Sequence, residues 1–171
     1  IPLWTNACPK ISLLITAILV TSCGIYSFSG TSIQPDVHTI CVEPIVNNAL
    51  KVNPSLSNQL TEALLDKYKK LTKLRQVDDM ADLYVSGEIT SYDIQATAIT
   101  ADEVAAQNRL TVTVRIKYSN VKYPEEDFEQ NFVAYRDYSS ERSLDEVEAT
   151  LCDEIVETIV EDIFNATVAQ W

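Results

Sequence analysis

The sequence predicts an α+β two-layer sandwich, in which a four-stranded mixed sheet carries two helices on one face, in the order βαβββα. Apolar and polar residues alternate along four stretches, which is typical of half-buried strands. Two other stretches repeat apolar residues every three or four positions, which is typical of amphipathic helices. One strand–helix–strand crossover requires a parallel pair, whereas the later strands can pair as hairpins.

Length and composition indicate one globular domain. The chain has 171 residues, of which 46% are hydrophobic and 22% are charged. Only three residues are glycine, which argues against a phosphate-binding loop. The formal net charge of −12 disfavours nucleic acid and anionic membrane surfaces as partners, because both require a basic patch.

An apolar run near the start resembles the core of a signal peptide. Residues 11–20 are almost entirely apolar and follow Lys10. A membrane-spanning helix needs about twenty apolar residues, so this run is too short to be one. The sequence Val20-Thr21-Ser22-Cys23 follows directly and resembles a bacterial lipobox. In such a box the signal peptidase cuts before the cysteine, here between Ser22 and Cys23.

The chain is therefore expected to have three parts. They are a signal peptide at residues 1–22, a lipidated tether at 23–36 and a single α/β domain at 37–171. The sulfur of Cys23 would carry diacylglycerol and its amine an acyl chain, which together give stable anchoring. The alternative is an ordinary signal peptide with an accidental cysteine. By analogy, Gly24 in place of Asp favours the outer membrane, with the domain on its periplasmic face.

The first strand and the first helix follow the tether. Residues 37–46 alternate, with Ile40 and Val42 on one face of the predicted strand. Asn53 and Pro54 predict the start of a helix, with the asparagine as cap and the proline at the first helical position. The apolar stripe of this helix comprises Leu56, Leu60, Ala63, Leu64, Tyr68 and Leu71.

Three strands are predicted next. Residues 83–89 alternate, and the apolar phase slips near residues 92–94, which predicts a bulge. After a connection at 101–107, residues 110–118 alternate strictly and form the clearest strand. A turn at Pro124-Glu125-Glu126 leads into a fourth strand near residues 128–138.

A long helix from about residue 144 to residue 169 ends the predicted domain. Ser143 and Glu146 have the spacing of a capping box at its start. Its apolar stripe includes Val147, Leu151, Ile155, Ile159 and Ile163.

No residue pattern indicates an enzyme, a metal site or a cofactor other than the acyl chains. His38 is the only histidine and has no second ligand at a suitable spacing. No Gly-x-Ser-x-Gly or Ser-x-x-Lys motif stands at a predicted strand–helix junction, where a serine nucleophile would be expected. The pairs Asp78-Asp79 and Glu125-Glu126 fall in predicted turns, where solvated surface is the simpler interpretation.

Two cysteines remain in the predicted domain. The oxidising periplasm permits a disulfide between Cys41 and Cys152. However, Cys152 lies on the apolar side of the last helix, whereas Cys41 is out of phase with Ile40 and Val42. Two separate buried or half-buried thiols are therefore the favoured interpretation.

Basic residues cluster on one predicted strand. Arg115 and Lys117 share one face because they are two residues apart, and Arg109 shares it if the strand begins that early. These side chains could contact the phosphate or carboxylate groups of an anionic ligand. The favoured alternative is a solvent-facing row that pairs with acidic residues on neighbouring strands.

Several stretches together resemble one protein family. They are residues 23–30 (CGIYSFSG), Asn53-Pro54-Ser55-Leu56, Asn108-Arg109-Leu110-Thr111-Val112 and the ending 161–171 (EDIFNATVAQW). Along essentially the whole mature chain, the sequence is similar to LptE, the lipopolysaccharide-assembly lipoprotein family, in its Bacteroidetes form.

The resemblance implies a non-catalytic outer-membrane lipoprotein. Such a protein plugs the LptD β-barrel, helps that barrel to assemble, and assists lipopolysaccharide transport to the outer leaflet. An LptD-like barrel is thus the implied partner. Lipopolysaccharide is a candidate ligand, with Arg109, Arg115 and Lys117 as its candidate contacts. The alternative function is a periplasmic lipoprotein that acts as a small-ligand-binding or secretion-system accessory module, and co-purification with a large barrel would separate the two.

Overall fold

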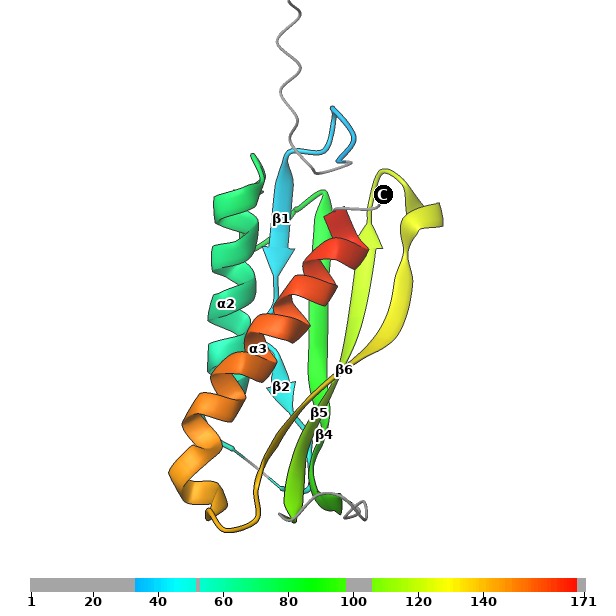
Figure 1. The fold of residues 1–171 in the computed structure, drawn as a ribbon. Helices are drawn as coiled ribbons and strands as arrows, with labels where there is room; N and C mark the ends of the chain where they lie inside the picture. The colour runs from blue at the N-terminus through cyan, green and yellow to red at the C-terminus, as the bar shows by residue number, and fades with distance from the viewer. Residues whose placement is uncertain (1–32, 52, 98–105, 169–171) are drawn as a thin grey trace, which may run out of the picture.

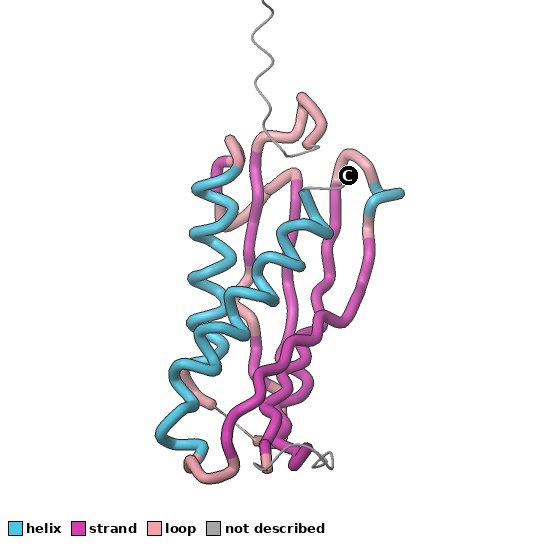
Figure 2. Tube along the Cα trace, in the orientation of Figure 1, coloured by secondary structure: helices cyan, strands magenta, loops and turns pink. Residues whose placement is uncertain are grey.

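Two helices cover one face of a single mixed sheet (Figures 1 and 2). The computed structural model describes residues 33–51, 53–97 and 106–168. The predicted signal peptide and the lipobox lie outside these residues. Within them, no helix has both the length and the apolar character needed to cross a membrane.

The sheet has six strands, in the order β3-β1-β4-β5-β6, with β2 also paired to β4. The strands are β1 (Thr39–Val42), β2 (Val46–Asn47), β3 (Arg75–Gln76), β4 (Leu83–Thr97), β5 (Gln107–Asn120) and β6 (Phe128–Ser139). β1 and β2 run parallel to β4, and β5 runs antiparallel to both β4 and β6. The predicted α+β class, the parallel crossover and the single helix-covered face are confirmed, but the predicted number of four strands is wrong.

The two additional strands have simple causes. The predicted strand at residues 37–46 is divided into β1 and β2 around Pro44, which has no N–H to donate to the sheet. The next N–H, that of Ile45, instead donates to Thr61 Oγ1 at 3.0 Å. The other additional strand, β3, contains two residues beside β1, too few for any alternation to be visible in the sequence.

Helix α2 (Leu56–Leu71) starts later than predicted. The side-chain oxygen of Asn53 accepts hydrogen bonds from Ser55 N at 3.0 Å and Ser55 Oγ at 2.8 Å. Asn53 therefore closes a turn before the helix and is not its cap, and Pro54 lies in that turn. At the other end, Leu71 was predicted to lie on the apolar stripe, but half of its surface is exposed.

The β4–β5–β6 meander follows the predicted pattern. The apolar residues of β5 from Leu110 to Tyr118 are at most 2% exposed. The register between β4 and β5 shifts between Ile89 and Ser91, so the predicted bulge exists two to four residues earlier than expected. A 3-10 turn, η1 (Pro124–Glu126), occupies the predicted turn before β6.

Helix α3 (Leu144–Val168) packs against α2, β5 and β6 and completes the core. All five predicted stripe residues of this helix are buried. Glu146 accepts a hydrogen bond from Ser143 N at 3.3 Å, so one half of the predicted capping box forms. The buried hydroxyls of Tyr68 on α2 and Thr167 on α3 are 2.7 Å apart and link the C-terminal ends of the two helices.

Candidate functional site

The sheet face that the helices leave uncovered carries the predicted basic residues. β5 begins at Gln107, so Arg109, Arg115 and Lys117 share this face, opposite the buried residues Leu110 to Ile116. The register places acidic residues of β4 and β6 beside them. The structure therefore confirms that the three basic residues share a face. An acidic residue lies opposite each of them on a neighbouring strand, and Arg109 and Arg115 form ion pairs with these residues.

Arg109 forms the best-defined ion pair on this open face. Its Nε and Nη2 atoms lie 2.7 and 2.9 Å from the two carboxylate oxygens of Asp137, directly across the β5–β6 pair. The guanidinium also lies over the ring of Tyr135, 4.0 Å from its centroid. The hydrogen bonds from Arg109 lower the pKa of Asp137 below its usual value.

Arg115 and Lys117 differ in their surroundings. Arg115 Nη1 lies 2.9 Å from Glu88 on β4, and its Nε lies 3.9 Å from Glu129 on β6. Among the described residues, no carboxylate lies within 4.0 Å of the Lys117 ammonium group. A shallow depression of about 300 Å³ separates these side chains and is lined also by Gly87.

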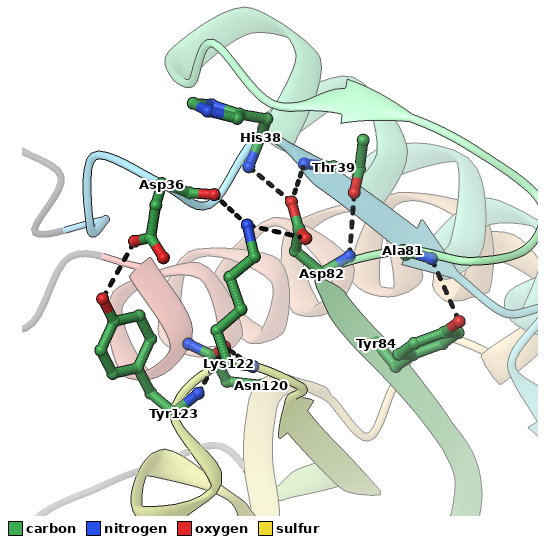
Figure 3. Close-up of polar contacts among 9 residues, drawn as sticks. All are labelled: Asp36, His38, Thr39, Ala81, Asp82, Tyr84, Asn120, Lys122 and Tyr123. Carbon is green, nitrogen blue, oxygen red and sulfur yellow. Dashed lines mark hydrogen bonds and ion pairs between the residues drawn. The ribbon is translucent and has the colours of Figure 1, made fainter.

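A second polar cluster, the N-terminal junction, lies at the end of the sheet where the described chain begins (Figure 3). One carboxylate oxygen of Asp82 accepts hydrogen bonds from His38 N at 2.7 Å and Thr39 N at 3.1 Å. The other lies 3.0 Å from Lys122 Nζ. The hydrogen bond from His38 N is the largest of the effects that lower the pKa of Asp82 to about 2.

The junction also holds the residues that precede β1. Lys122 Nζ donates to the backbone oxygen of Asp36, and Tyr123 Oη donates to the Asp36 carboxylate at 3.0 Å. Nearby, Gln34 donates to Glu126. These bonds join residues more than 80 positions apart, so no sequence pattern indicated them. They attach the beginning of the described chain to the sheet.

The other predicted candidates have no catalytic surroundings. The side chain of His38 is exposed, and no group of three metal-ligating residues occurs in the part of the chain that the structure describes. Cys41 and Cys152 are both buried and unpaired, as the sequence favoured. Burial raises the pKa of both thiols, to about 11 for Cys152. The Asp78-Asp79 pair is exposed.

The comparison with protein families decides the assignment. The family described as LptE, lipopolysaccharide-assembly, matches residues 37–167, which is the whole of the folded domain. The chain belongs to the LptE family. This is a non-catalytic lipoprotein family, in agreement with the expectation that the chain is not an enzyme. No curated protein matches the chain.

Several solved structures align with the chain at low sequence identity. A neuraminyllactose-binding hemagglutinin homologue from Helicobacter pylori aligns with a TM-score of 0.53 and 11% identity, covering 81% of this chain and 87% of the other. The protein CT253 from Chlamydia trachomatis aligns with a TM-score of 0.49 and 10% identity, and the alignment covers 76% of this chain and 97% of the other. A minor lipoprotein from Acinetobacter baumannii aligns with a TM-score of 0.45 and 13% identity, and the alignment covers 74% of this chain and 89% of the other.

Proposed function

We propose that this LptE-family chain is an outer-membrane lipoprotein that plugs and helps to assemble an LptD-like β-barrel and assists lipopolysaccharide transport to the outer leaflet. The observation that carries the proposal is the family match over residues 37–167. The lipobox-like sequence ending at Cys23 supplies the anchor, with cleavage after Ser22 and acyl chains on the cysteine. The domain then lies on the periplasmic face of the outer membrane.

The open face of the sheet has the chemistry that a barrel plug requires. The lumen of a large outer-membrane barrel is lined with polar side chains. On the open face, ion pairs such as Arg109–Asp137 and Arg115–Glu88 alternate with hydroxyl and amide groups, whereas the opposite face is apolar and covered by α2 and α3. A plug that presents this face to the lumen places mainly polar side chains against polar walls, with Val46, Val133 and Tyr135 as exposed apolar exceptions.

Isolation of the partner tests the scaffold role. The chain, carrying a C-terminal affinity tag, is extracted from native outer membranes with mild detergent, and its stable partner is identified by mass spectrometry. We expect a large β-barrel in stoichiometric amount. Recovery without a barrel, but with a small ligand or a secretion-system component, would contradict the plug role and support the alternative accessory function.

Lipid attachment is tested at Cys23. Growth with a traceable fatty acid should label the wild-type chain and leave Cys23→Ser unlabelled and unprocessed, because the acylated sulfur is missing. Equal labelling of both chains would exclude this residue as the attachment site. The folded domain begins after the tether, so the substitution should not alter its circular dichroism.

Direct lipopolysaccharide binding is a separate question, tested at Arg115 and Lys117. If these side chains contact the phosphorylated glycolipid, charge-assisted bonds of about 1.5–3 kcal/mol each would be lost in the double change to Glu, and binding would be abolished. A titration with labelled lipopolysaccharide at two salt concentrations measures this. Unchanged binding in the double variant would remove these residues from the site.

A further inference from the structure

One corner of the domain combines exposed apolar and basic groups beside the beginning of the described chain. A groove of about 460 Å³ there is lined by Ile33, Pro35, Lys70, Leu71 and Lys73, and we call these five residues the tether-end corner. Leu71 is the last residue of α2, and it is 50% exposed. Figure 1 shows that the C-terminal end of α2 and the segment before β1 lie at the same end of the molecule.

Two neighbouring loops at this end also expose large apolar side chains. Met80, between β3 and β4, is 88% exposed, and Val121, directly after β5, is 61% exposed. Val121 N donates to the backbone oxygen of Asp82, which places both loops beside the N-terminal junction. Met80 has a φ of 52°, an uncommon conformation for a residue other than glycine. Asp79 Oδ1 accepts a hydrogen bond from Met80 N and stabilises this turn.

The basic side chains of the corner are available for an external anion. Lys73 has no carboxylate within 4.0 Å among the residues that the structure describes, and Lys70 has only the exposed, helix-internal partner Asp66 at 3.2 Å. The net charge of −12 describes the whole chain, but charges interact over only about 8 Å at physiological ionic strength. The five residues of the corner carry two positive charges, and the exposed carboxylate of Asp66 lies beside one of them.

The length of the tether keeps this corner close to the lipid anchor. Nine residues lie between Cys23 and Ile33, so the ten Cα–Cα steps span at most about 35 Å. Because the N-terminal junction attaches Asp36 to the sheet, the tether leaves the domain at this end and not at the opposite one.

We propose that the tether-end corner, with Met80 and Val121, is a membrane-contact surface that rests on the phospholipid leaflet holding the anchor. The apolar side chains enter the interface between headgroups and acyl chains, and Lys70 and Lys73 contact lipid phosphates. Because the acidic pair Asp78-Asp79 lies beside Met80, the contact is local and depends on the tether. The inference rests on the proposed acylation of Cys23.

A site-directed fluorescence experiment tests the contact. The mature chain is prepared with a hexahistidine tag in place of Cys23 and bound to vesicles of phosphatidylethanolamine and phosphatidylglycerol that contain nickel-chelating lipid. A single cysteine replaces Leu71 and carries an environment-sensitive fluorophore. Its matched control replaces Leu50, which is fully exposed and precedes the opposite end of α2, about 24 Å away along the helix. Burial protects Cys41 and Cys152 from labelling.

We expect quenchers on the lipid chains to quench the probe at position 71 and not the probe at position 50. With the tag in place, Lys73→Gln should lower the ratio of quenched to unquenched probe at position 71 about fivefold, whereas the control Lys51→Gln should not change it. Equal quenching at the two positions, or quenching at 71 only when a barrel is present, would overturn the proposal. The tag replaces the acyl chains, so a failure of acylation at Cys23 cannot be mistaken for a failure of the contact.

Discussion

The substitution Gly87→Ala tests the packing between β4 and β5, because the packing determines whether the change raises or lowers the stability of the fold. Gly87 pairs with Ile116, and a Cβ added at Gly87 would lie 2.5 Å from Arg115 O and 2.6 Å from Ile116 Cδ1. The oxygen belongs to the backbone of a strand held between β4 and β6, so it cannot move away without breaking the ladder.

The expected magnitude follows from two opposing effects. Overpacking of a filled site costs about 1–3 kcal/mol. Replacing glycine by alanine inside a strand would otherwise stabilise by about 0.5–1 kcal/mol. Because the close contact is with a backbone oxygen, the upper part of this range, about 2–3 kcal/mol, applies. The net destabilisation of Gly87→Ala should therefore be about 1–2.5 kcal/mol, which lowers the Tm of a domain of this size by roughly 3–8 °C.

Urea unfolding followed by circular dichroism measures this effect. The midpoint should fall in Gly87→Ala while the m-value stays constant, because the surface exposed on unfolding is unchanged. The neighbouring control Ser86→Ala, on the open face, should shift stability by no more than about 0.5 kcal/mol. An unchanged or higher midpoint in Gly87→Ala would show that the backbone of β5 can shift to accommodate the added methyl group, and it would refute this account of the packing.

Three further substitutions or treatments have defined outcomes. The pKa of Asp82 is about 2 when folded and about 3.9 when unfolded, so its stabilising contribution is present above about pH 4 and lost as the pH falls towards 2. The Tm difference between wild type and Asp82→Asn should therefore shrink as the pH falls from about 4 to 2. A difference that grows over this range would contradict the stabilising role of the Asp82 carboxylate. Cys41 and Cys152 should both react with a thiol reagent in denaturant but slowly in native buffer, and no reaction in denaturant would indicate a disulfide. Tyr68→Phe should lower the free energy of unfolding by about 1 kcal/mol, because the buried hydrogen bond to Thr167 is lost. Urea unfolding measures this change, and an unchanged midpoint would show that the bond does not contribute to stability.

The fold could be predicted where a periodic pattern is long enough to be seen. Strict alternation from Leu110 to Tyr118 identified β5 and both of its faces, and the phase slip identified the bulge beside Ile89. The two-residue strands β2 and β3 could not be predicted in this way, because two residues show no period. The start of α2 was misplaced because the Asn53 side chain bonds within the preceding turn.

The candidate sites could likewise be predicted only where they depend on the local residue pattern. The shared face of Arg109, Arg115 and Lys117 follows from residue parity alone, and so could be predicted. The bidentate contact with Asp137 depends on the register between two strands, which the sequence pattern does not specify. The N-terminal junction is harder still to predict from the sequence, because Asp82 accepts hydrogen bonds from the backbone of residues more than 40 positions earlier. Backbone N–H groups carry no residue identity, and therefore leave no signal in a sequence.

The position of α3 after all of the strands has a consequence for folding during the proposed export. The β4–β5–β6 meander consists of hairpins between neighbouring segments, which close quickly. Its apolar face, including Val112 and Val114, is covered by α3, which follows every strand in the described part of the chain. In a chain exported as we propose, the sheet carries an uncovered apolar surface from the completion of β6 until residue 168 has crossed the inner membrane. We expect the chain to be most prone to aggregation, and most in need of a chaperone, during that interval.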